Sequence, residues 1–309
     1  MTLAGLRVAV TGASGFCGAE VARRAAAAGA DVRCLGRRPG PVGRHVHWDA
    51  AAGPPDLSGV DAVLHLAAAV GDPVPGHVTE RDFTAVNVDG TARLLDALGA
   101  RPLVWVSSAS VYDPRLRAPR LTEEHPIGGQ LTAYGRTKAA GEALALRSGA
   151  VVLRPRAVYG RGDPHLLPRL LRAVRAGRIL LPGPDGELSL TAVENLADAC
   201  LAALGWRPGA YNITDARPYR RDETIRAAAQ AATGRVIRVG HVPVPLAFAA
   251  ATAVTRLSRL AGAAPGLTRY AVDQVAHPVV LSIERALAAG YRPRRCFADF
   301  LTEGGARPA

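Results

Sequence analysis

The sequence predicts an α/β protein with a doubly wound parallel sheet (Rossmann type) and a smaller, partly interleaved C-terminal substrate region. Three observations support this fold class. Apolar runs alternate with alanine- and leucine-rich segments, a glycine-rich turn follows the first run, and 309 residues suffice to bury a large core. Continuous apolar runs are typical of parallel strands that are covered by helices on both faces.

Six apolar runs in the first half of the chain predict the strands of this sheet. They lie at residues 6–11, 31–36, 45–49, 61–67, 102–108 and 150–155. The segments between most of them predict helices at 16–28, about 79–99 and about 131–148. In such an alternating fold, ligands bind at the carboxyl ends of the strands.

The second half of the chain is interrupted by prolines and glycines, and two further helices are expected there, at about 222–233 and 245–262. We therefore expect a dinucleotide-binding domain at residues 1–160, to which residues 186–215 return. Residues 161–309 would form mainly the substrate-binding region.

The composition excludes several classes of function. The net charge of +12 permits an acidic partner, but the arginines are scattered and aromatic residues make up only 5% of the chain. Nucleic-acid binding, which needs a clustered basic face that often carries stacking aromatics, is therefore not expected.

The cysteines and the apolar runs bear on location. Cys17, Cys34, Cys200 and Cys296 lie far apart and form no CxxC pair, so we expect a reduced, cytoplasmic protein without a metal site. The chain opens almost directly on a strand, and no signal peptide is expected. The longest apolar run, around 242–254, is broken by prolines, so no membrane span is expected either.

The glycine-rich turn TGASGFCG, at residues 11–18, predicts a dinucleotide site. Gly12 permits a tight turn, Gly15 lets the backbone approach a pyrophosphate, and Gly18 allows close packing of the helix on the strand. The N-terminus of the following helix offers free N–H groups to the anion. We expect Ser14 and Phe16 of this turn to contact the cofactor as well.

The end of the second strand bears on which dinucleotide binds. An NAD-binding fold usually has an acidic residue there, which accepts a hydrogen bond from the ribose 2′-hydroxyl. This sequence has Gly36 instead, followed by Arg37 and Arg38, which could hold a 2′-phosphate. NADP(H) is therefore favoured, and NAD(H) remains possible because the two arginines could simply be solvated.

Lys138 is the only lysine among the 38 basic residues of the chain. It follows Tyr134 by four positions, so the two side chains share one face of the predicted helix. A nearby ammonium favours the phenolate form of a tyrosine, and arginine cannot supply a compact, tunable ammonium. The pair predicts proton-transfer chemistry at the sheet edge, where Ser108 ends a strand.

Several motifs in one order resemble those of the extended short-chain dehydrogenases/reductases, the NAD-dependent epimerase/dehydratase family, and lie nearer its ketone- and steroid-type reductases. They are TGASGFCG (11–18), DAVLHLAAA (61–69), NVDGTARLL (87–95), VSSASVY (106–112), YGRTK (134–138), LRPRAVYGRGD (153–163) and AGYRPR (289–294).

The resemblance implies a role for each matching residue. Tyr134 would be the general acid/base, Lys138 would bind the nicotinamide ribose and lower the pKa of Tyr134, and Ser108 would polarise the substrate oxygen. The further positions that it implies for the cofactor are Asp49, Leu66, Ala67, Ala68, Asn87 and Pro155. For Asn87, the contact would be with the cofactor or with a water near it. His65, on an apolar strand, is expected to be a packed core residue.

Departures from the family pattern narrow the expected reaction. Ala109 and Ser110 stand where the family's dehydratases carry an Asp–Glu pair, so dehydration is not expected. Ala157 and Leu188 stand where its nucleotide-sugar enzymes carry an asparagine and a diphosphate-binding arginine. We therefore expect an NADP-dependent ketoreductase or alcohol dehydrogenase for a small, largely uncharged molecule.

Two other functions remain open at this point. One is a nucleotide-sugar epimerase or 4-ketoreductase, in which Arg154, Arg161 or Arg169 replaces the missing arginine. The other is a non-catalytic NADP-binding regulator, which would have no need of the tyrosine–lysine pair. Relatives commonly form dimers through helices equivalent to 79–99 and 131–148, so a homodimer is expected.

Overall fold

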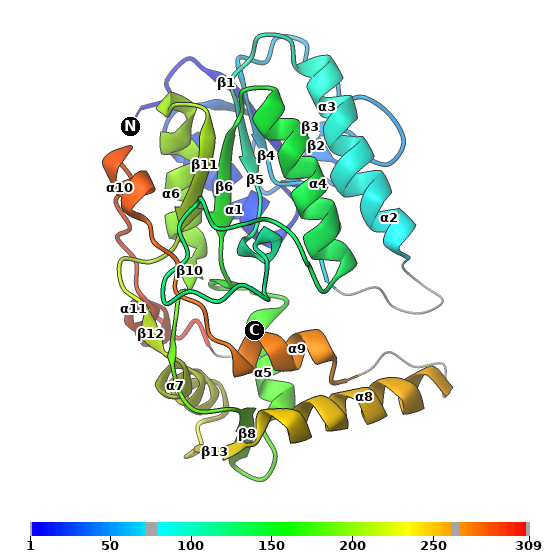
Figure 1. Cartoon of the computed structure of the whole chain (residues 1–309). Coiled ribbons are helices and arrows are strands. Elements are labelled where there is room, and N and C mark those ends of the chain that lie inside the picture. Colours follow the sequence, from blue (N-terminus) through cyan, green and yellow to red (C-terminus); the bar gives the residue numbers. More distant parts are fainter. Residues whose placement is uncertain (1, 72–78, 261–265, 307–309) are drawn as a thin grey trace.

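A seven-stranded parallel sheet forms the centre of the protein (Figure 1). The computed structural model describes residues 2–71, 79–260 and 266–306. The strands lie in the order β11-β6-β5-β4-β1-β2-β3. Their bounds are β1 Arg7–Thr11, β2 Asp31–Gly36, β3 Arg44–His47, β4 Ala62–His65, β5 Leu103–Val106, β6 Val151–Pro155 and β11 Gly209–Ile213.

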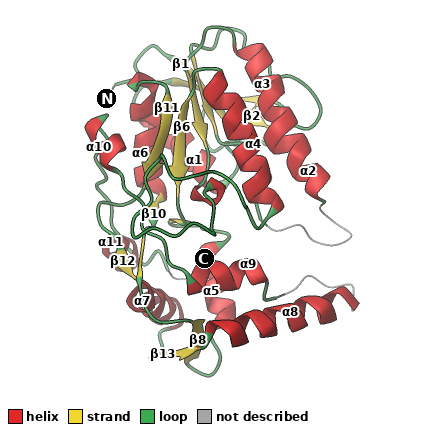
Figure 2. Cartoon of the chain, in the orientation of Figure 1, coloured by secondary structure: helices red, strands yellow, loops and turns green. Residues whose placement is uncertain are grey.

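Helices cover both faces of this sheet (Figure 2). Side chains of β1 alternate between the faces: Val8 and Val10 pack in the core beneath α1 and α6, whereas Ala9 packs in the core beneath α3 and α4. Two apolar cores explain why the strands are continuously apolar. The helices are α1 Phe16–Ala27, α3 Gly90–Leu98, α4 Ala133–Arg147 and α6 Val193–Ala202.

The sequence prediction of a doubly wound parallel sheet is confirmed, and all six predicted strands belong to it. Strand β11, which pairs with β6, was not predicted, because its five residues include the polar Asn212. The predicted helix 79–99 is α2 Glu80–Thr84 followed by a π-helical turn, η1 Ala85–Asp89, and then α3.

A second group of elements lies at the carboxyl end of the sheet (Figure 1). The predicted helix 222–233 is α7, and the prediction 245–262 corresponds to α8, with its last two residues outside the described ones. None of the described helices is long and apolar enough to cross a bilayer. The larger elements here are α5 Leu166–Ala173, β8 Arg178–Pro182, α7 Arg221–Thr233, β13 Arg238–Val242, α8 Val244–Leu260, α9 Arg269–Ala276 and α11 Phe297–Thr302.

Short elements connect these parts. They are η2 Ala109–Val111, β7 Val158–Tyr159, β9 Glu187–Leu188, β10 Thr191–Ala192, η3 Ala203–Gly205, β12 Tyr219–Arg220 and α10 Glu284–Ala288. Strand β8 pairs in parallel with β13, and two further pairings, β7 with β10 and β9 with β12, join two-residue strands.

A buried ion pair fixes α4 on the sheet. Glu142 of α4 is fully buried and Arg154 of β6 is 2% exposed, and their side chains approach to 2.5 Å. Ser107 also donates a hydrogen bond to Glu142, and Arg154 donates to the hydroxyl of Tyr112 at 3.0 Å. The charges are thus satisfied inside the protein, and loss of one partner would leave the other buried and uncompensated.

We therefore expect Glu142→Gln to lower the free energy of unfolding by about 3–5 kcal/mol, because Arg154 stays buried without its counter-charge. Urea denaturation followed by circular dichroism measures the change. Arg136→Gln is the matched control, since it breaks the exposed ion pair with Glu80 and should shift the midpoint far less. Equal shifts for the two variants would contradict this interpretation of the buried pair.

Candidate active site

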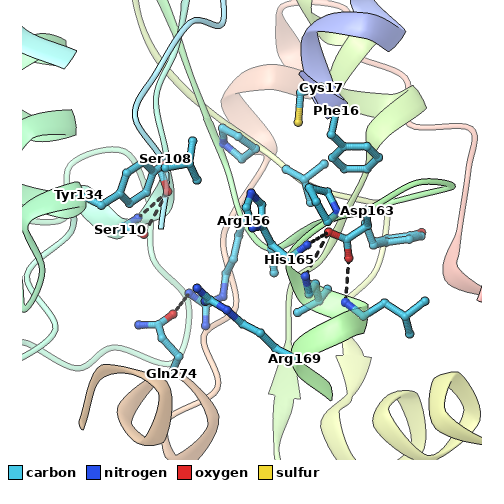
Figure 3. A pocket seen from close by; sticks show the side chains of 18 of the residues that line it. Phe16, Cys17, Ser108, Ser110, Tyr134, Arg156, Asp163, His165, Arg169 and Gln274 are labelled. Atoms are coloured by element: carbon cyan, nitrogen blue, oxygen red, sulfur yellow. Dashed lines mark hydrogen bonds between the residues drawn. The ribbon is translucent and has the colours of Figure 1, made fainter. Parts of the chain in front are cut away.

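A cleft of about 1540 Å³ lies at the carboxyl ends of the central strands. Its wall comes from the loops that follow β1 to β6 and from the second group of elements (Figure 3). The predicted site residues in this wall are Gly12, Ser14, Gly15, Phe16, Arg37, Arg38, Asp49, Leu66, Ala67, Ala68, Ser108, Tyr134, Lys138 and Pro155.

The glycine-rich turn has the geometry that a pyrophosphate site needs. Gly12 adopts a φ of 68°, and a Cβ at this position would lie 2.8 Å from the backbone nitrogen of Ala67. A Cβ on Gly18 would lie 2.2 Å from the carbonyl oxygen of Gly12, so only glycine lets α1 begin this close to the turn. The first turn of α1 has no acidic residue, and its N-terminus lines the cleft. These features fit a dinucleotide.

Thr11 ties the loop after β4 to this turn. Its hydroxyl accepts hydrogen bonds from the backbone N–H groups of Leu66 and Ala67, each at 3.0 Å. The same hydroxyl contacts Nδ1 of His65 at 2.8 Å. His65 is 1% exposed, and burial lowers its pKa to about 3. The prediction that His65 is a packed core residue is confirmed.

Asn87 does not line the cleft, although it was predicted to contact the cofactor or a nearby water. It is 1% exposed and lies in the π-helical turn η1. Its side chain accepts a hydrogen bond from the N–H of Ala69 at 2.8 Å and donates to the Ala69 carbonyl at 3.1 Å and to Thr137 at 3.0 Å. In this structure Asn87 therefore holds the loop after β4 against α4.

Tyr134 and Ser108 lie close to each other in the wall of the cleft (Figure 3). Tyr134 lies in the first turn of α4, which begins after Thr132, a residue that caps the helix by accepting a hydrogen bond from Gly135. Ser108 follows β5, and its hydroxyl contacts that of Ser110 at 3.1 Å. Burial raises the pKa of Tyr134, and a hydrogen bond with Ser108 opposes this rise.

Lys138 is buried one helical turn after Tyr134. Its ammonium donates a hydrogen bond to the carbonyl oxygen of Val106 at 2.6 Å and lies 3.7 Å from the centre of the Trp105 ring. Burial lowers the pKa of Lys138 to about 7, and the nearby Glu142 opposes this. Its ammonium is thus directed at Val106 and Trp105 in this structure. The expected lowering of the Tyr134 pKa by Lys138 stays a prediction.

The substrate end of the cleft contains residues that the sequence analysis missed. Arg156, Tyr270 and Gln274 line the wall near Ser110, whose hydroxyl lies 3.5 Å from that of Tyr270. Arg156 lies inside the motif LRPRAVYGRGD but was given no role there, and Tyr270 and Gln274 come from α9, which no motif marked. Only the fold brings these residues together.

Of the three arginines proposed to replace a diphosphate-binding residue, only Arg169 lines the cleft. Arg154 is instead buried in its ion pair with Glu142, and Arg161 is exposed outside the cleft wall. The described residues bring together no group of three or more histidine, cysteine, aspartate or glutamate side chains that could hold a metal ion.

The comparison with protein families agrees with this geometry. Residues 8–214 match the NAD dependent epimerase/dehydratase family. The chain belongs to this family. The resemblance that the motifs indicated is therefore confirmed, and the protein is an enzyme of the extended short-chain dehydrogenase/reductase type.

Relatives within the family include oxidoreductases. The chain is 29% identical to a 3 beta-hydroxysteroid dehydrogenase/Delta 5-->4-isomerase of Mycobacterium tuberculosis, over 96% of this chain and 89% of the relative. It is 31% identical to a 2-alkyl-3-oxoalkanoate reductase of Stenotrophomonas maltophilia, over 94% and 95% of the two chains. The solved structure of MoeE5 with UDP-glucuronic acid and NAD is similar in fold, with a TM-score of 0.71, 24% identity and coverage of 96% and 97%.

The pKa of Lys138 predicts a pH dependence of stability. A lysine titrates near 10.5 in the unfolded chain and near 7 in the folded protein. Between these values the unfolded chain binds the extra proton, so the free energy of unfolding should rise with pH from about 7 to 10.5. The contribution of this one group is on the order of 3–5 kcal/mol.

Urea denaturation of the wild type and of Lys138→Met at several pH values tests this prediction. The unfolding free energy of the wild type minus that of Lys138→Met should increase as the pH rises through this interval. Because all other titrating groups are shared, the difference isolates Lys138. A difference that stays constant from pH 7 to pH 10 would show that Lys138 keeps its ordinary pKa in the folded protein.

Proposed function

We propose that the protein is an NADP(H)-dependent ketoreductase or alcohol dehydrogenase that acts on a small, mainly apolar molecule. The observation that carries this proposal is the position of Tyr134 and Ser108 in the wall of the cleft, with Lys138 one helical turn away. The two curated relatives described above are a dehydrogenase and a reductase, which is the reaction class that we propose.

Tyr134 and Ser108 have separate roles in the proposed reaction. In reduction, Tyr134 donates its phenolic proton to the carbonyl oxygen, and in oxidation it removes the proton from the hydroxyl group. Ser108 donates a hydrogen bond to the same oxygen and fixes its position between the two side chains. When bound, the nicotinamide supplies the hydride or accepts it.

Lys138 would bind the nicotinamide ribose through its ammonium. Its present partner is the carbonyl oxygen of Val106, at the end of β5. Since the ammonium is already held in the floor of the cleft by Val106 and by the Trp105 ring, little side-chain freedom remains to be lost when a ribose hydroxyl binds.

The cofactor preference rests on the end of β2. Gly36 ends the strand without an acidic side chain, and Arg37 and Arg38 line the cleft directly after it. A carboxylate at this place would repel a 2′-phosphate, whereas a guanidinium forms charge-assisted hydrogen bonds with it. This arrangement supports NADP(H).

A nucleotide-sugar epimerase or 4-ketoreductase is the second candidate, because Arg169 and Arg156 place cationic groups in the same cleft. The two candidates differ in how they treat the cofactor. An epimerase must regenerate its dinucleotide in each cycle and should copurify with it, whereas a ketoreductase should release it. Turnover of UDP- or dTDP-sugars, but not of aryl or alicyclic ketones, would favour the epimerase.

Tyr134→Phe should lower kcat by about 100- to 10,000-fold, because the general acid/base is lost. Binding of NADPH, measured by fluorescence titration, should remain close to that of the wild type. Tyr211→Phe is the matched control, since the Tyr211 hydroxyl donates to the Arg207 carbonyl at 2.9 Å and Tyr211 is not among the described residues that line the cleft. Normal turnover by Tyr134→Phe would overturn the proposed mechanism.

Arg37→Ala should raise the Kd for NADP(H) by about tenfold or more and leave that for NAD(H) nearly unchanged. The reason is that only NADP(H) carries the 2′-phosphate. Isothermal titration calorimetry with both dinucleotides measures the two constants. An equal loss for both would show that Arg37 does not recognise this phosphate.

A further inference from the structure

Hydrogen bonds of its backbone hold Arg156 in the cleft wall. Its N–H donates a hydrogen bond to the hydroxyl of Thr191 at 3.1 Å, and the same hydroxyl donates to the Arg156 carbonyl at 2.9 Å. The next residue, Ala157, has a φ of 45°, which is unfavourable for any residue with a Cβ. A strained conformation persists only where its surroundings hold it, and such positions are concentrated at functional sites.

In the part of the chain that the structure describes, no carboxylate pairs directly with the guanidinium of Arg156. Its Nε is buried without a hydrogen-bond partner there, and its Nη1 meets only the side-chain oxygen of Gln274, at 3.4 Å. Asp273 is close enough to favour the charged form, but its carboxylate contacts His277 at 2.9 Å and Arg117 at 3.9 Å. A guanidinium stays protonated in proteins, so the half-buried Arg156, with its Nε buried and unpartnered among the described residues, favours an anion beside it.

This guanidinium lies near the reactive groups. Figure 3 shows Arg156 extending into the cavity, with Gln274 on one side and Ser108, Ser110 and Tyr134 beyond it. Some residues of this end also line a smaller side cavity of about 130 Å³. The shared residues include Ser110, Arg156, Tyr270 and Gln274. All four are polar, and they form a compact polar subsite.

The wall beyond this subsite combines apolar side chains with the arginines Arg169 and Arg172 of α5. Its apolar members include Leu166, Leu167, Leu170, Ile225 and Val275, which come from α5, α7 and α9. A ligand that fills this cleft therefore meets the polar group around Arg156 next to Tyr134 and, farther on, a surface with many apolar side chains. Such a surface matches an amphiphilic molecule with its charged group close to the reacting carbon.

We propose that Arg156 determines substrate specificity by binding a carboxylate that lies close to the carbonyl or hydroxyl group served by Tyr134. The substrate class is a 3-oxo acid, or the corresponding 3-hydroxy acid, with an apolar chain. A guanidinium and a carboxylate form two parallel hydrogen bonds, and Ser110, Tyr270 and Gln274 surround the pair with further polar groups. This inference rests on the proposed function and adds one anionic group to its small, mainly apolar substrate.

The test is isothermal titration calorimetry of the protein saturated with NADP⁺, with 3-hydroxydecanoate and its methyl ester as a matched pair. The wild type should bind the acid about tenfold or more tightly than the ester, because only the acid carries the anion. Arg156→Gln should weaken the acid about 10- to 100-fold and leave the ester nearly unchanged. Arg147→Gln, an exposed arginine at the end of α4, removes the same charge elsewhere and should change neither constant.

Arg156→Lys keeps the charge but loses the two parallel hydrogen bonds, so it should keep part of the preference for the acid. Thermal melting shows whether Arg156→Gln folds. If it does not fold, Arg156→Lys still tests the proposal. No binding of the acid, or an equal loss of acid and ester in Arg156→Gln, would overturn the proposal. Tight binding of UDP that Arg156→Gln abolishes would also overturn it, in favour of a diphosphate.

Turnover of the same pair distinguishes this proposal from the proposed function. Formation of NADPH from the ester as readily as from the acid would leave the ketoreductase assignment in place and refute the role of Arg156. Binding that depends on Arg156, without oxidation of either compound, would instead refute the ketoreductase assignment and leave the carboxylate subsite standing.

Discussion

The buried ion pair between Glu142 and Arg154 is the interaction on which the site depends. Tyr134, Lys138 and Glu142 follow one another at intervals of four residues, so they form one stripe along α4. Glu142 anchors this stripe to β6 inside the core, Lys138 contacts the end of β5, and Tyr134 reaches the cleft. A shift of the anchored end along the sheet would move all three groups together. The proton-transfer group is thus positioned from the core outward.

Arg154 and Arg156 are close in sequence but have different surroundings. Arg154 is paired with a carboxylate and hydrogen-bonded inside the fold, so its charge contributes to structure. Arg156, two positions later, lies in the cleft wall with its Nε unpartnered among the described residues. Between and beyond the two arginines the chain changes direction, because Pro155 ends β6 and Ala157 has a positive φ. This short turn therefore separates an arginine that stabilises the fold from one that can bind a ligand.

Much of the fold and of the cofactor end could be predicted, because each depends on local sequence. The turn around Gly12 and the continuous apolar run of β1 are signals contained in a few neighbouring residues. The substrate end could not be predicted in the same way, since Arg156 and Tyr270 are 114 positions apart in sequence and meet only after folding. The role of Asn87 shows a further limit: its residue type was recognised, but only the structure places it behind the cleft wall. The expected homodimer stays a prediction.

The π-helical turn η1 constrains how this chain can change in length. A π turn contains one residue more than an ordinary helical turn. A π turn and an ordinary turn sweep nearly the same angle, so deleting a single residue from Ala85–Asp89 would restore regular winding with little rotation of α2 relative to α3. It would instead remove the bulge that contains Asn87 and disturb the contacts of Asn87 with Ala69 and Thr137. Insertions and deletions should therefore be rarer among descendants of this gene at these five positions than in the exposed connections nearby.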